Sequence, residues 1–260
     1  MSTEALGKYA NSVGALGLEA LPSRRLIREV KQGKLPRVGL IYSLHENWSV
    51  DRIQDEKLTP KKKAGALKRR AINLVKRSIS ATFPQESDST PVLDRLGKEY
   101  DLQTVFHWPE HTKKYVKPTL EIHENIGKYS ADDKPWTIDQ IINWASEDPS
   151  RKLALDISVR KLIAYFQTQG ITKLADIIDG MKRLLPYAGI IHFQVANKAE
   201  FTAVKTMNMD SDFAEMTRVA KKNAPNANFV IEIPYPTAFR AKPFRPKKYF
   251  QKAVAFIQKA

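Results

Sequence analysis

Cysteine is absent from this chain of 260 residues. A sequence without cysteine excludes disulfide bonds, thiolate nucleophiles and cysteine-ligated zinc sites. The absence also removes the usual sign of a secreted, disulfide-linked scaffold, because disulfides mark oxidising compartments. We therefore expect a cytoplasmic protein.

Long apolar runs and glycine-rich loops are missing as well. No stretch of about 18 apolar residues occurs, so we expect no segment to span a membrane. The N-terminal segment has no basic region followed by an apolar core, and it does not resemble a signal peptide. No GxGxxG or Walker-type loop follows a predicted strand, which excludes the usual devices that hold nucleotide phosphates.

Positive charge, by contrast, is in excess. The chain has 43 lysine and arginine residues against 28 aspartate and glutamate residues, a formal net charge of +15. Such an excess favours polyanionic partners: nucleic acid, anionic lipid or phosphorylated substrates. It is also consistent with a solvated surface that binds nothing.

Two segments hold the densest positive charge, a predicted helix over residues 61–76 and the run 240–248. Aromatic residues interleave with the second run and could stack on nucleic-acid bases. The alternative is a solvated helix face followed by a proline-stiffened loop. The basic residues that we single out are Lys61, Lys62, Lys63, Lys68, Arg69, Arg70, Lys247 and Lys248.

Strands and helices are predicted to alternate along most of the chain. Apolar residues make up 42% of the sequence, enough to fold around a core. Continuous apolar strands separated by helices favour a parallel sheet covered on both faces. We expect strands at 37–43, 78–83, 102–108, 118–123, 152–157, 189–195 and 228–233, and helices at 61–76, 137–146, 159–167, 172–185, 211–222 and 246–258.

The predicted fold class is an α/β protein, a complete or incomplete (β/α) TIM-like barrel. Residues 1–34 are expected to form a helical N-terminal extension, and residues 35–260 a single α/β barrel domain. A doubly wound open sheet is the second choice. The link between the strands 102–108 and 118–123 is short for a crossover helix, which makes this part of the barrel the hardest to place.

Several predicted strands carry a single ionisable residue within an apolar run. The four that we select are Glu121, Asp156, His192 and Glu232. A buried carboxylate without a partner is costly, and the carboxyl ends of parallel barrel strands form the active-site face. These side chains could therefore meet and bind a divalent metal ion. Each could instead be an ordinary hydrogen-bonded residue, and His107 and Glu124 are additional candidates.

These residues also carry a resemblance to a known family. The four positions lie 35, 36 and 40 residues apart, within the local sequences Leu155-Asp156, Ile191-His192 and Ile231-Glu232. The pattern, over roughly residues 100–235, resembles the xylose-isomerase-like TIM-barrel superfamily, which holds sugar-phosphate isomerases, epimerases and endonuclease IV.

The resemblance implies a sugar or sugar-phosphate isomerase or epimerase that uses a divalent metal ion: manganese, zinc or cobalt. The implied ligands are Glu121, Asp156, His192 and Glu232. The implied catalytic residues are Glu121 and Glu232, which would exchange a proton at a carbon of a hydroxy-ketone on opposite sides of the substrate. Lys198 or a basic loop could hold a substrate phosphate.

Two other functions remain open on the sequence. The positive charge favours a nucleic-acid-binding or endonuclease-IV-like protein. A barrel that has lost its metal and acts as a regulatory or interaction protein is the third hypothesis. The sequence leaves the oligomeric state unknown.

Overall fold

The computed structural model describes residues 12–14, 18–20, 28, 41–45, 94–99, 103–106, 118–122, 135–158, 161–195, 197–232 and 246–260. Within these ranges, side chains are described except at 18–20, 41–45, 121, 161, 232 and 246. All statements below refer to these parts of the chain.

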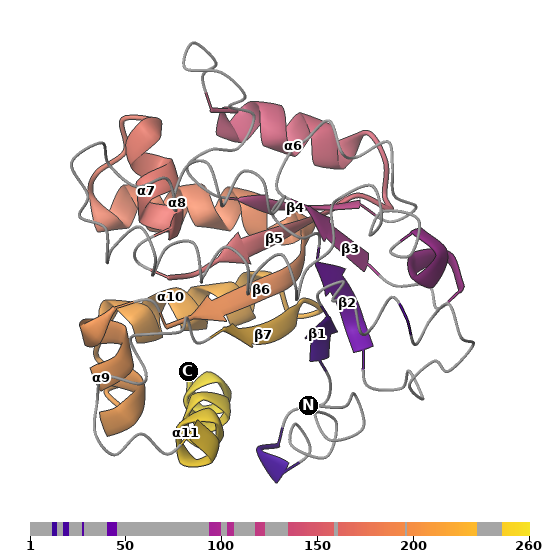
Figure 1. Ribbon diagram of the computed structural model, residues 1–260. Coiled ribbons are helices and arrows are strands. Elements are labelled where there is room, and N and C mark those ends of the chain that lie inside the picture. Colours follow the sequence, from indigo (N-terminus) through magenta and orange to yellow (C-terminus); the bar gives the residue numbers. More distant parts are fainter. Residues whose placement is uncertain are drawn as a thin grey trace, which may run out of the picture.

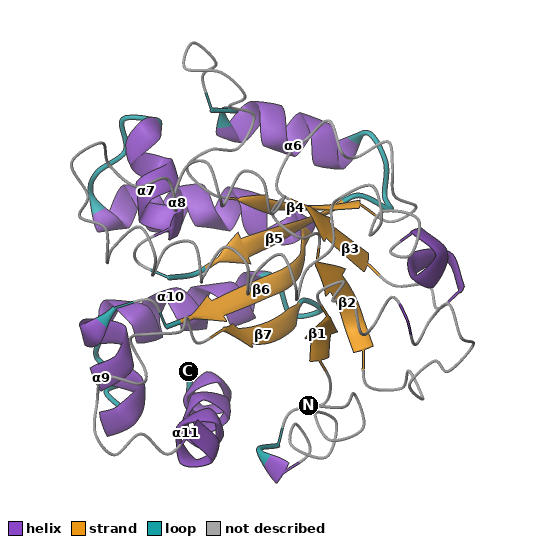
Figure 2. Cartoon of the chain, viewed as in Figure 1, coloured by secondary structure: helices purple, strands orange, loops and turns teal. Residues whose placement is uncertain are grey.

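One parallel sheet organises the fold. Its strands follow one another in chain order, each paired in parallel with the next. The sheet curls, with helices outside it (Figures 1 and 2). The fold is thus an incomplete TIM-like barrel, as the sequence predicted. The strands are β1 (Leu18–Ala20), β2 (Ile41–His45), β3 (Gln103–Phe106), β4 (Pro118–Ile122), β5 (Lys152–Asp156), β6 (Ala188–Gln194) and β7 (Asn228–Glu232).

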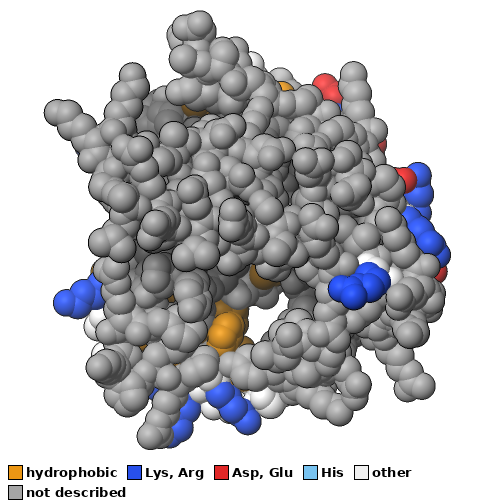
Figure 3. Space-filling model, viewed as in Figure 1, with side chains coloured by type: hydrophobic (Ala, Val, Ile, Leu, Met, Phe, Trp, Pro, Cys, Tyr) orange, Lys and Arg blue, Asp and Glu red, His pale blue; other side chains and the backbone are white. Residues whose placement is uncertain are grey.

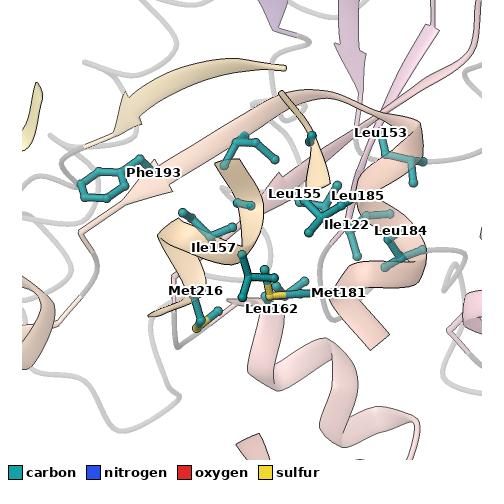
Figure 4. Close-up of a cluster of buried hydrophobic side chains, with 14 of the residues drawn as sticks. Ile122, Leu153, Leu155, Ile157, Leu162, Met181, Leu184, Leu185, Phe193 and Met216 are labelled. Carbon is teal, nitrogen blue, oxygen red and sulfur yellow. The ribbon is translucent and has the colours of Figure 1, made fainter. Parts of the chain in front are cut away.

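The two faces of the sheet bury different side chains. Leu153 and Leu155 of β5 belong to the large core cluster, which also contains residues of the surrounding helices (Figure 4). Ala154, between them, belongs to a small cluster with Val105 and Ile190 of neighbouring strands. Successive strand residues point to opposite faces. The large cluster therefore lies on the outer, helix-covered face, and the small one lines the inner face.

Helices follow the later strands and cover the outer face. Three of them begin with a side-chain cap: Thr137, Asn197 and Ser211 each accept a hydrogen bond from the backbone N–H three residues on. Such caps satisfy N–H groups that the first helical turn leaves without a partner. The helices are α6 (Ile138–Ser146), α7 (Lys161–Thr168), α8 (Leu174–Leu184), α9 (Lys198–Thr206), α10 (Asp212–Asn223) and α11 (Pro246–Lys259).

The N-terminal part differs from the prediction. Residues 1–34 were expected to be helical, yet β1 lies within them and pairs with β2. Pairing with a neighbouring strand, which local sequence does not reveal, fixes this short segment as a strand. The predicted strand at 37–43 is found as β2, shifted toward the C-terminus. The predicted helix at 61–76 and strand at 78–83 lie outside the described residues.

From β3 onward the predicted elements are found within a few residues of their expected bounds. The exception is α9, which the sequence prediction omitted. β3 and β4 are parallel neighbours despite the short link between them. Across the described ranges, no helix combines the length and the apolar character needed to cross a membrane.

Gly180 of α8 provides a test of how tightly the outer layer is packed. A Cβ at this position would lie 2.3 Å from Cε1 of Phe166, a fully buried ring that packs edge-on against Tyr165. We expect Gly180→Ala to lower the free energy of unfolding by about 1–3 kcal/mol, because overpacking outweighs the better helix propensity of alanine. Urea unfolding measures the change.

The sign of the change in the free energy of unfolding distinguishes overpacking from helix propensity. Helix propensity alone would make alanine stabilising by about 1 kcal/mol. A stabilised Gly180→Ala protein would therefore contradict the close packing of α7 and α8. The control combines Gly180→Ala with Phe166→Leu, which shortens the obstructing side chain and should recover part of the loss.

Candidate functional site

Two ionisable side chains meet on the inner face of the sheet. Asp156 is the last residue of β5, and it pairs in register with His192 of β6. Nδ1 of His192 lies 3.0 Å from Oδ1 of Asp156, and both side chains are fully buried. The structure thus brings together two of the four residues selected from the sequence.

Strand geometry explains why these side chains meet. Ala154 lines the inner face, so Asp156, two residues later, points to the same side. Ile190 and His192 are related in the same way on β6. Parallel strands in register then place the carboxylate beside the imidazole. The backbone ladder continues past the pair, since the N–H of Ile157 donates to the carbonyl of His192 at 3.1 Å.

Burial requires the two groups to stabilise one another. An ionised carboxylate in an apolar interior is costly unless it accepts hydrogen bonds from a partner. With Asp156 ionised, the proton of His192 belongs on Nδ1, which donates to Oδ1. In the neutral imidazole the lone pair is then on Nε2, the arrangement found in metal-binding and general-base histidines oriented by a carboxylate.

Further polar side chains lie in this region that were not predicted from the sequence. Gln194 lies two residues beyond His192 and Ser158 two residues beyond Asp156, and both are buried. On the strands next to them, the hydroxyl of Thr119 donates to Oε1 of Gln103 at 2.6 Å. The period-two alternation from Asp156 and His192 is the signal that could have identified Ser158 and Gln194.

The other two selected residues take suitable positions in the sheet. Glu121 is in β4, paired with Ala154, and Glu232 ends β7, paired with Gln194. Their side chains lie outside the described part of the structure, as do residues His107 and Glu124. The register therefore agrees with a four-strand site, while only Asp156 and His192 are seen in contact.

Some of the predicted basic residues lie in the described part of the structure, and the others lie outside it. Lys247 and Lys248 are exposed in the first turn of α11. Lys198, proposed for a substrate phosphate, is exposed at the start of α9. The remaining members lie outside the described residues: Lys61, Lys62, Lys63, Lys68, Arg69 and Arg70.

The donor chemistry of the pair suits a divalent metal ion. An imidazole nitrogen and a carboxylate oxygen are ligands that zinc, manganese and cobalt accept. Among the side chains that the structure describes, no group of three or more histidine, aspartate or glutamate residues is arranged to hold a metal. A complete ligand set would therefore have to draw on side chains outside the described part of the structure, and Glu121 and Glu232 are the candidates from the sequence.

Comparisons with known proteins give a distant likeness in fold. No protein-family model and no curated protein matches the sequence. Two of the solved structures found are of an amidohydrolase from Burkholderia multivorans, one with bound HEPES and one with bound zinc. Their TM-scores are 0.42 and 0.41 at 9% and 10% identity, over 98% of this chain and 80% of the other.

This result corrects the predicted family. The strand-end residues predicted a member of the xylose-isomerase-like superfamily, and the structures found are amidohydrolases instead. The prediction was wrong because the motifs behind it are not specific to one family. Any buried parallel strand with a polar end has an acidic or histidine residue after two or three apolar ones. Such short patterns identify the barrel architecture and leave the family open.

A double-mutant cycle tests the contact between the two buried side chains. We expect Asp156→Ala and His192→Ala each to lower the free energy of unfolding by about 3–5 kcal/mol, because each leaves a buried polar partner behind. The double variant should cost less than the sum by about 0.5–3 kcal/mol. Strictly additive losses in urea unfolding would mean that the two side chains do not interact.

Proposed function

We propose that this protein is a metal-dependent barrel enzyme, with its site at the carboxyl ends of β4 to β7. The observation that supports the proposal is the fully buried contact of 3.0 Å between Asp156 and His192. Buried ionisable pairs at strand ends of parallel barrels are typical of active sites. Asp156 and His192 would be two ligands, and Glu121 and Glu232 would supply the others.

Each residue has a definite part in this proposal. Asp156 accepts the Nδ1 proton of His192 and so fixes the orientation of the imidazole, whose Nε2 would be the ligand atom. The apolar inner cluster beneath the pair, with Ala154 and Ile190 as members, keeps water from that side. A divalent ion, when bound, supplies Lewis-acid polarisation of a substrate oxygen.

The finer part of the proposal concerns the reaction. We infer isomerisation or epimerisation of a small sugar or phosphosugar. Glu121 and Glu232 belong to strands on either side of the Asp156–His192 pair, so one can remove a proton from a substrate carbon and the other return it.

Metal content tests the proposal directly. The protein would be purified, loaded in turn with manganese, zinc and cobalt, dialysed and analysed for bound metal. We expect about one equivalent in the wild type. We also expect loss in Asp156→Asn and in His192→Gln, because each removes a ligand with little change in size. Solvent deuterium appearing in a hydroxy-ketone sugar phosphate would then identify the proton-transfer reaction.

The matched control is Thr119→Val, which removes another inner-face hydrogen bond, the one to Gln103. This variant should retain the metal. A wild-type protein that holds no metal after loading would contradict the proposal, and so would equal binding by Asp156→Asn. Metal-dependent ester or amide hydrolysis without deuterium exchange would retain the metal site and overturn the isomerase assignment.

A further inference from the structure

Helices α9 and α11 form one continuous part of the outer layer. The rings of Phe201 and Tyr249 stack with centroids 4.6 Å apart and planes 6° from parallel. Farther along both helices, Nζ of Lys252 donates to the carbonyl oxygen of Lys205. The two helices also lie next to each other in Figure 1. Their solvent-facing sides therefore form a common surface.

Lysines line this surface in two rows. At about 100° per residue, Lys248, Lys252 and Lys259 of α11 lie within about 40° of one another around the helix. Lys198 and Lys205 of α9 are seven residues apart and so share a face. All five are exposed, and lysine and arginine side chains are visible along the lower edge of Figure 3. We call these five lysines the α9–α11 basic surface.

Carboxylates do not neutralise these lysines from the same helices. The sequence of α11, PKKYFQKAVAFIQK, contains neither aspartate nor glutamate. The single acidic residue of α9 is Glu200, which is 2% exposed and accepts a hydrogen bond from the backbone N–H of Asn197. The outward faces of both helices are therefore uniformly positive, and such a surface attracts polyanions.

The apolar side chains of α11 leave little for a membrane to bind. Tyr249, Ala253 and Phe256 are buried in the core cluster. Between the exposed lysines, the outward face has Gln251, Ala255 and Gln258. Insertion into a bilayer requires a large apolar face directed outward, whereas binding to phosphate groups requires only the amines.

The geometry points to a site for the phosphate backbone of duplex nucleic acid; we propose that the α9–α11 basic surface binds it without reading sequence. Lys248 and Lys259 are about 16 Å apart along the helix axis at 1.5 Å per residue. This row of lysines is therefore long enough to contact more than one phosphate of the same strand. Stacking of Phe201 on Tyr249 occupies these two rings, so the contacts are to phosphates rather than to bases.

Fluorescence anisotropy with a labelled 20-base-pair DNA duplex, measured over a series of salt concentrations, tests the proposal. The variant combines Lys205→Gln, Lys248→Gln and Lys259→Gln, all at exposed positions. With three phosphate contacts removed, the slope of log K against log salt should fall by about 2.7. The affinity at the lowest salt concentration should fall at least tenfold.

The control removes the same three charges elsewhere, through Lys98→Gln, Lys173→Gln and Lys182→Gln. All three are exposed: Lys98 in the helix at 94–99, Lys173 at the N-cap of α8 and Lys182 within α8. The control should keep the wild-type slope. Equal losses in both variants would show that net charge alone drives binding and would overturn the proposal. Absence of duplex binding by the wild type would also overturn it, as would binding only to vesicles of phosphatidylserine.

Discussion

A side-chain hydrogen bond between two parallel strands connects the fold of this protein to its candidate site. Asp156 and His192 are both fully buried and 3.0 Å apart. Neither could be buried cheaply alone, since an isolated charge in an apolar interior has lost its water. Their contact depends on the parallel register of β5 and β6, which pairs Asp156 with His192.

The two faces of the sheet bury different kinds of side chain, and this difference makes the candidate site possible. The outer face holds large side chains, such as Leu153 and Phe193, in a core shared with the helices. On β5 and β6 the inner face has apolar Ala154 and Ile190, each followed two residues later by the polar side chains Asp156 and His192. Stability thus comes mainly from one face, which leaves the other free to hold reactive groups.

Much of the fold could be predicted because local and global signals agree from β3 onward. The helices predicted at 137–146 and 211–222 are found, and Thr137 and Ser211 are their N-caps. The missed helix α9 had a readable signal: Asn197 followed three residues later by Glu200 is a capping box, and both of its hydrogen bonds are present. β1 had none, since three residues are too few to show periodicity.

The candidate site could be predicted only in part. A lone ionisable residue in an apolar strand drew attention to Asp156 and His192, and the structure places these two buried side chains in contact, as burial demands. Their role as metal ligands stays a prediction. Which strand supplies that partner depends on register, and the sequence does not show it. The family prediction was wrong for a related reason. The short strand-end motifs reflect burial, which many unrelated barrels share.

The central claim is that Asp156 fixes the proton and the orientation of His192. Nitrogen-15 NMR of the histidine side chain measures this directly, with His192 assigned by its absence in His192→Gln. The account predicts a proton on Nδ1 that is hydrogen-bonded to Asp156, and a change in the nitrogen-15 shifts of His192 in Asp156→Asn. An imidazole protonated on Nε2 alone, or a spectrum unchanged by Asp156→Asn, would contradict the account.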